Sequence, residues 1–130
     1  MSGIDDLRAF GAALSEPVRE LEDHLEITQL VAQYGPAVDS GSAAAAAAPW
    51  TQDGVFEAVG AISMRGREAI AGMVRGNGHR GLILNGCGHV LMVPHVVVRG
   101  DVATGRSYAL NIRWDAAADR FRVARVSANT

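Results

Sequence analysis

The stretch LVAQYGPAVDSG, residues 30–41, holds the end of the first predicted helix and two polar side chains, Tyr34 and Asp39. Apolar residues recur at helical spacing up to this point, and carboxylates cover the other side of the same segment. Pro36 has no N–H to donate to the preceding turn, so we expect the helix to bend here and Gly41 to end it. The bend falls next to Tyr34 and Asp39, and we expect it to aim both side chains.

The helix is expected to begin well after the N-terminus. Ser15 is a suitable N-cap, and Pro17 falls in the first turn, where a missing N–H does no harm. Residues 1–14 are therefore predicted to form a loose or partly helical leader. The rest of the chain, residues 15–130, is predicted to form a single domain.

Helical patterns dominate the first half of the chain and strand patterns the second. Short elements are expected in the first half in this order: a helix at 43–48, a strand at 55–59, a helix at 67–74 and a flexible loop at 76–78. The second half predicts one bent strand or two strands within 82–98, a hairpin turn at 99–101, a strand ending near Trp114, a turn at 116–119 and a last strand at 120–129.

This order predicts an α+β fold. Helices are expected to pack on a strongly curved, mostly antiparallel sheet, which forms a cone with an internal pocket. Along the strand that ends near Trp114, the small residues Ser107, Ala109 and Asn111 share one face, which suits the pocket. The bulky residues take the other face, which suits a contact between subunits.

Composition excludes several classes of protein. No run reaches the roughly 18 apolar residues of a membrane helix, and the N-terminus lacks the pattern of a signal peptide. Cys87 is the only cysteine, which excludes an internal disulfide and suits the cytoplasm. We therefore expect a cytoplasmic protein that makes no contact with membranes.

Charge is distributed unevenly along the chain. Residues 1–57 hold ten carboxylates and two arginines, whereas residues 58–130 hold four carboxylates and ten arginines. The arginines are dispersed without interleaved aromatic residues, so nucleic acid is not an expected partner. Arg120, Arg122 and Arg125 are expected to form a solvated strand edge or to pair with the acidic helix across a subunit contact.

The motifs in their order resemble the SnoaL-like branch of the nuclear-transport-factor-like superfamily, which has a cystatin-like α+β barrel. The resemblance covers roughly residues 20–130, and it is carried by Leu21-Glu22-Asp23, Tyr34 to Asp39, Trp50 with Asp53-Gly54, Gly66-Arg67-Glu68-Ala69-Ile70, Gly88-His89, Gly100-Asp101-Val102-Ala103 and Ser107-Tyr108. Members of that superfamily include scytalone dehydratase, a bile-acid dehydratase, a hexachlorocyclohexane dehydrochlorinase and polyketide cyclases. Such relatives continue into one more strand, so the sheet here is expected to be one strand shorter or to expose an edge.

The resemblance implies roles for five residues. Asp39 matches an aspartate that orients a histidine, and His89 matches that histidine, which removes a proton from the substrate. Tyr34 matches a tyrosine that faces the substrate carbonyl. Asn111 stands where the bile-acid dehydratase has an aspartate, so only hydrogen bonding is left there. Asn129 matches a substrate-binding asparagine.

Three of these residues also have a structural interpretation. Asp39 suits the turn before Gly41, His89 suits a core histidine bonded to backbone, and Tyr34 suits a packed ring. Three further residues are predicted to line the pocket or to fill the core: Trp50, Phe56 and Cys87.

No cofactor is expected. The spacing of His24, His79, His89 and His95 predicts no metal site, and no glycine-rich phosphate loop is present. A carboxylate that holds an imidazole, next to a tyrosine hydroxyl, suits proton abstraction beside a carbonyl.

Together the residues favour a cofactor-independent lyase or isomerase, similar to a dehydratase, that acts on a largely apolar, carbonyl-bearing small molecule. The alternative is a non-catalytic domain of the same fold that binds a hydrophobic ligand or serves in assembly. A homo-oligomer, dimer or trimer, is expected in either case.

Overall fold

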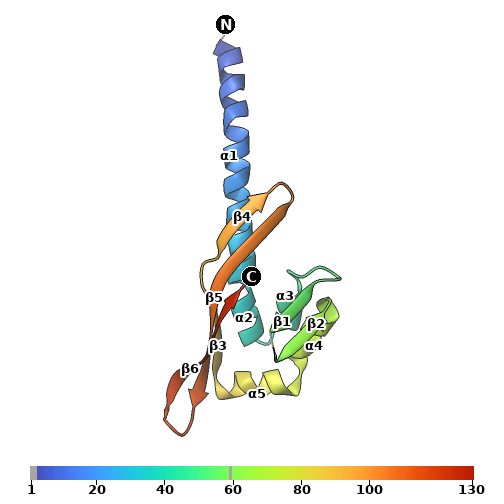
Figure 1. Ribbon diagram of the computed structural model, residues 1–130, viewed down its shortest axis with the longest axis vertical. Helices are drawn as coiled ribbons and strands as arrows, with labels where there is room; N and C mark the ends of the chain where they lie inside the picture. Colours follow the sequence, from blue (N-terminus) through green and yellow to red (C-terminus); the bar gives the residue numbers. More distant parts are fainter. Residues whose placement is uncertain (1–2, 59) are drawn as a thin grey trace.

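The computed structural model describes residues 3–58 and 60–130 of the chain. Its first feature is helix α1 (Gly3–Ala32), which extends beyond the rest of the molecule (Figure 1). The helix begins twelve residues before the predicted N-cap, because the first residues are largely helix formers. The prediction that Ser15 caps the helix is therefore wrong: its hydroxyl lies inside α1 and donates to the carbonyl of Ala12 at 2.8 Å. The division into a leader and one domain stays a prediction.

The predicted bend before Asp39 is present as a break in the helix. Helix α1 ends at Ala32, and α2 (Tyr34–Asp39) follows after the turn residue Gln33. The break lies at the carbonyl that Pro36 cannot bind, as its missing N–H requires. Gly41, with a φ of 72°, follows the end of α2 in the left-handed region that glycine tolerates.

The middle of the chain forms a small layer of helices and one hairpin. Its elements are α3 (Ala43–Ala47), β1 (Val55–Ala58), β2 (Ile62–Arg65), α4 (Arg67–Arg75) and α5 (Asn77–Asn85). Strands β1 and β2 form an antiparallel pair. The predicted strand at 55–59 is thus found at β1, and its expected last residue, Val59, lies outside the described residues.

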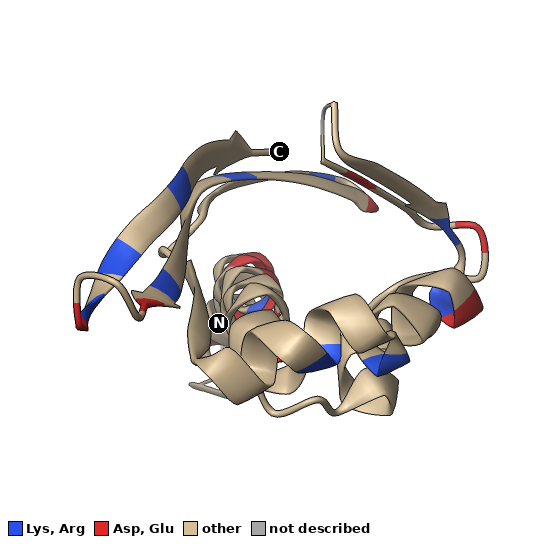
Figure 2. Cartoon of the chain, turned by 90° about the horizontal axis from the view of Figure 1, so that it is seen from below, with Lys and Arg blue, Asp and Glu red and all other residues tan. Residues whose placement is uncertain are grey.

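Strand β5 organises the second half of the chain. The strands are β3 (Cys87–Leu91), β4 (His95–Arg99), β5 (Val102–Asp115) and β6 (Arg120–Asn129). All pairings are antiparallel: β5 pairs with both β3 and β4, and separately with β6. Figure 2 shows these strands arching over the helices, with the concave side toward them. This arrangement confirms the predicted α+β class.

Two predictions about the middle of the chain are wrong. The flexible loop expected at 76–78 is absent, because helix α5 begins at Asn77, directly after Gly76, and the residues expected to begin a strand at 82 belong to the same helix. Strand β2 was not predicted either. In both places the short apolar runs fit helix and strand equally well, and packing against neighbouring elements determines the outcome.

The apolar core lies between the helices of the middle layer and the β1–β2 hairpin. Its buried residues come from α2, α3 and α4: Ala37, Val38, Ala46, Ala47, Ile70, Ala71 and Val74. Most are small, so helices α2, α3 and α4 approach one another closely. Within the described residues, no helix combines the length and apolar character needed to span a lipid bilayer.

Candidate active site

Helix α2 lies directly against strand β3 because Gly35 has no side chain. A Cβ at Gly35 would overlap the carbonyl oxygen of His89. The contact sets the distance between the last residue of α2, Asp39, and the side chains on the inner face of β3. A larger residue at position 35 would move the helix away from the strand.

The carboxylate of Asp39 binds His89 through both of its oxygens. Oδ1 lies 2.6 Å from Nδ1 of the imidazole, and Oδ2 accepts the backbone N–H of His89 at 2.7 Å. The side chains are 25% and 20% exposed respectively, so both reach solvent while remaining partly buried. The structure thus brings together two residues that lie fifty positions apart in the sequence.

This hydrogen bond determines the state of the histidine ring. With Asp39 ionised, Nδ1 carries the proton that it donates to Oδ1, so in the neutral ring Nε2 keeps its lone pair. The fixed carboxylate also stabilises the imidazolium that forms when Nε2 takes a proton. The pair can therefore accept a proton at Nε2 and hold it.

Cys87 lies beside the same carboxylate. Its thiol donates to Oδ1 of Asp39 at 3.6 Å, as a weak third donor. Burial, the negative charge of Asp39 and this hydrogen bond all raise the pKa of the thiol, whereas the positive charge of Arg113 lowers it. The balance keeps Cys87 protonated at neutral pH, which is the unreactive form of a cysteine.

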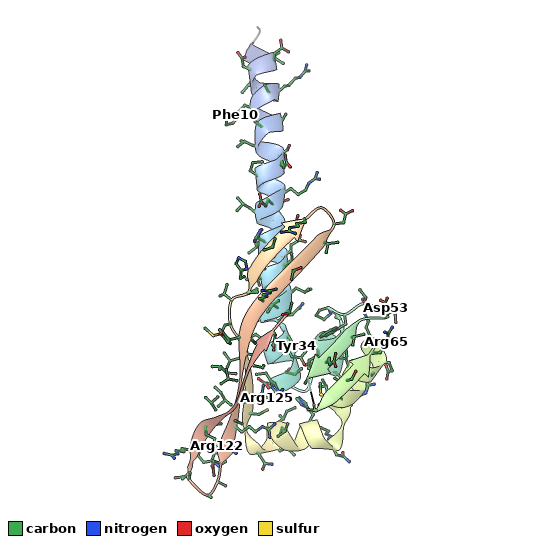
Figure 3. The ribbon with its side chains drawn as sticks, in the orientation of Figure 1. Phe10, Tyr34, Asp53, Arg65, Arg122 and Arg125 are labelled. Carbon is green, nitrogen blue, oxygen red and sulfur yellow. The ribbon has the colours of Figure 1, made fainter. Side chains whose placement is uncertain are left out.

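Tyr34 begins α2, and its ring lies in an aromatic cluster. The ring stacks on Phe56 at 6.3 Å between centroids, and Phe56 in turn meets Trp50 edge-on at 5.8 Å. Burial, followed by the negative charge of Asp39, raises the pKa of the Tyr34 hydroxyl. The hydroxyl is thus a neutral hydrogen-bond donor. Figure 3 labels Tyr34 between the long strands and the β1–β2 hairpin.

The two predicted asparagines lie at different distances from the dyad. Asn111 of β5 pairs directly with His89 of β3, so both side chains share one face of the sheet. Asn129 pairs with Ser107, four residues farther along β5. That separation is about 13 Å along a strand, so the structure does not bring Asn129 to the dyad.

His79 is a site residue that the sequence did not reveal. Its side chain, on α5, is 8% exposed, and its Nε2 lies 2.7 Å from the carbonyl of Val38. Its ring lies 5.8 Å from the ring of His89. The spacing from His79 to Leu82 and Ile83 is typical of one face of a helix, but the glycines around these residues favoured a loop instead.

The site also brings together three groups that can bind a metal ion. Ligand atoms of Asp39, Cys87 and His89 all lie within 4.8 Å of one another. In the present arrangement, however, both oxygens of Asp39 accept hydrogen bonds from His89, and the raised pKa of Cys87 disfavours the thiolate that a metal requires. The geometry therefore fits a hydrogen-bonded dyad better than a metal centre.

Two open hollows flank the β4–β5 hairpin, away from the dyad. One lies on the face of β4 and β5 that includes His95, Val97 and Arg106, and the other lies between α1 and the turn at Gly100. Neither includes a residue of the dyad, so we assign no part of the chemistry to them.

Comparison with known proteins places the whole arrangement in a family. A model of the SnoaL-like domain matches residues 19–130. No curated protein is similar enough in sequence to count as a match.

Three solved structures resemble the fold. An NTF2-like protein with a cystatin-like fold from Novosphingobium aromaticivorans has 42% sequence identity and a TM-score of 0.84, over 88% of this chain and 73% of that one. A variant of Rv3472, a Mycobacterium tuberculosis protein of unknown function, has 26% identity and a TM-score of 0.76, over 89% of this chain and 64% of that one. A Catenulispora acidiphila protein, with 20% identity and a TM-score of 0.53 over 85% of this chain and 93% of its own, supports the fold alone.

Proposed function

Since the chain belongs to the SnoaL-like family, which includes cofactor-independent isomerases and dehydratases, we propose that it is a lyase or isomerase that abstracts a proton beside a carbonyl. The observation that carries the proposal is the 2.6 Å contact between Asp39 and Nδ1 of His89, which leaves Nε2 as a base. The substrate class is a largely apolar small molecule that carries a carbonyl group.

Each residue has one role in this reaction. Nε2 of His89 takes a proton from the carbon next to the carbonyl, and Asp39 stabilises the imidazolium that results. The electron pair moves onto the carbonyl oxygen, where the neutral hydroxyl of Tyr34 donates a hydrogen bond to the enolate. Asn111 positions the substrate beside His89.

The enolate can then react in two ways. If a hydroxyl group lies on the β-carbon, the electron pair returns to form a carbon–carbon double bond, and the hydroxyl leaves as water with the proton from His89. If a double bond is already present, His89 returns the proton to a different carbon, and the product is an isomer. The substrate, rather than the dyad, decides between the two.

Proton abstraction can be measured without knowledge of the natural substrate. We expect the protein to catalyse exchange of α-protons for deuterium in a panel of β-hydroxy ketones and unconjugated enones in D2O, followed by NMR. His89→Ala should lower the exchange rate by about 10² to 10⁴, the usual contribution of a general base. Asp39→Asn should lower it as well, because the carboxylate no longer stabilises the imidazolium.

His95→Ala is the matched control, because His95 is exposed on β4 away from the dyad. It should retain the rate of the parent protein. Equal rates of deuterium exchange for His89→Ala and His95→Ala would contradict the proposal that His89 is the base.

The second candidate is a non-catalytic domain that binds a hydrophobic ligand. It is favoured by Asn111, which pairs with His89 and cannot titrate as a second acid or base. If the protein is an enzyme, His89→Ala should leave ligand affinity within roughly tenfold of the parent while turnover is lost. A parent protein that binds ligands of the panel but exchanges none of their protons would favour the binding domain.

A further inference from the structure

The concave face of the sheet carries two arginines next to the dyad. Paired residues on neighbouring strands share a face, so His89, Asn111 and Arg125 form one row across β3, β5 and β6. Cys87, Arg113 and Arg122 form the adjacent row, in which Arg122 is held by Asp115 of the same strand as Arg113. Asp39 contacts both Cys87 and His89, which identifies this face as the one toward α2.

A bulge in β6 sets the position of Arg125. The pairing shifts between Asn111, opposite Arg125, and Ile112, opposite Val123, so that Ala124 has no partner on β5. Bulges re-aim the side chains beside them and are frequent next to binding sites. Arg125 lies two strands from His89, a separation of about 10 Å.

Neither arginine is neutralised by an acidic side chain. Asp115 pairs with Arg122 at 3.2 Å. Within residues 3–58 and 60–130, Arg113 and Arg125 take part in no salt bridge. Arg113 is near enough to Cys87 for its charge to lower the pKa of the thiol, against the larger effects of burial and Asp39. Positive charge without a partner therefore borders the dyad.

An anionic group is the natural partner for this pair of side chains. A guanidinium group binds a carboxylate through two parallel hydrogen bonds, which fixes the orientation of the ligand as well as attracting it. The next row of the same face holds Leu91, Ala109 and Ser127, which can accommodate an apolar ligand body. The face thus offers an apolar row on one side of His89 and Asn111, with Arg113 on the other side and Arg125 at the end of their own row.

We propose that this face selects small molecules that carry a carboxylate group, which Arg113 and Arg125 bind, within a few carbon atoms of the carbonyl that reacts at His89. The position of the carboxylate relative to the carbonyl that reacts at His89 rests on the proposed function. Binding of the carboxylate does not, because it requires only the two arginines and the shape of the sheet.

The test is a comparison of acids with their neutral esters. A panel of keto acids from 4-oxopentanoate to 4-oxo-4-phenylbutanoate, each with its methyl ester, is titrated by calorimetry into the parent protein, Arg113→Gln, Arg125→Gln and the double variant. Each acid that binds the parent should do so about tenfold or more tightly than its ester, as expected for a hydrogen bond between charged groups. The preference should shrink in each single variant and vanish in the double variant.

Arg106→Gln is the matched control, because Arg106 is an exposed arginine on the opposite face of the same strand, β5. It should retain the full preference for the acids. The proposal is overturned if no acid of the panel binds the parent more tightly than its ester, or if the double variant keeps the preference. A preference for acids without any deuterium exchange would leave the anion site standing and would overturn only the proposed enzyme activity.

Discussion

A single carboxylate, that of Asp39, accepts hydrogen bonds from three donors at the candidate site. Two donors belong to His89 and one to Cys87. The negative charge of this partly buried carboxylate acts on two titratable side chains beside it. The raised pKa values of Cys87 and Tyr34 are direct results of this arrangement, together with burial.

The reactivity of Cys87 should report on Asp39. In Asp39→Asn the negative charge that raises the pKa of the thiol is lost, whereas burial remains. We expect the rate of alkylation by iodoacetamide at pH 7.5 to rise about threefold to tenfold, in proportion to the thiolate fraction. Because Cys87 is the only cysteine, total labelling measured by mass spectrometry reports this one site. The alkylation rate of the unfolded chain gives the upper limit. If Asp39→Asn alkylates at the same rate as the parent protein, the contact between Asp39 and Cys87 is contradicted.

Tyr34 should make the protein less stable at alkaline pH. Its pKa in the folded state is raised above the value in the unfolded chain. The resulting stabilisation is complete below about pH 10, the ordinary pKa of tyrosine, and is lost as the pH rises through the folded value. Urea unfolding between pH 8 and 11 should show this decrease, and Tyr34→Phe should show a smaller one. Cys87→Ala is the suitable background, because the thiol contributes in the same direction.

At the scale of elements, helix α5 shows where the sequence was insufficient. Helix α5 contains two glycines and short apolar runs, so local propensity favoured a loop followed by a strand. Contacts with α4, β3 and β5 stabilise the helix instead. The buried bond from His79 to the carbonyl of Val38 fastens α5 to α2. Such a contact joins residues 41 positions apart, which no local pattern can reveal.

The close approach of α2 to β3 can be tested at Gly35. Gly35→Ala should lower the free energy of unfolding by about 1 to 3 kcal/mol, because the new methyl group overlaps the backbone of His89. It should also separate Asp39 from His89 and so reduce deuterium exchange.

Gly72→Ala in α4 is the control, since a Cβ there meets no atom within 4 Å. It should raise stability by about 0.5 to 1 kcal/mol. Urea unfolding of the two variants distinguishes a steric effect at Gly35 from a general effect of replacing glycine in a helix. Similar shifts in both would contradict the importance of the close approach.

At the scale of the whole molecule, the sequence predicted the order of elements better than their three-dimensional register. The fold class, the hairpin turns and the pairing of Asp39 with His89 followed from local patterns and from family resemblance. The row that joins His89 to Arg125 did not, because it depends on two strand registers and on a bulge at Ala124. The distance of Asn129 from the dyad depends on the same register, which the family resemblance that suggested its site role did not contain.

The outer face of the sheet is expected to be the contact between subunits. It carries exposed apolar side chains in register across β5 and β6, among them Tyr108, Phe121 and Val126 at 59%, 59% and 60% exposed. Apolar patches of this kind mark interaction surfaces. Sedimentation velocity should show a homo-oligomer, which Val126→Glu converts to a monomer because a charge enters the buried patch. Leu7→Glu on α1 provides the control, since Leu7 is 71% exposed on a different surface. If Leu7→Glu dissociates the assembly and Val126→Glu does not, the contact lies along α1 instead of the sheet.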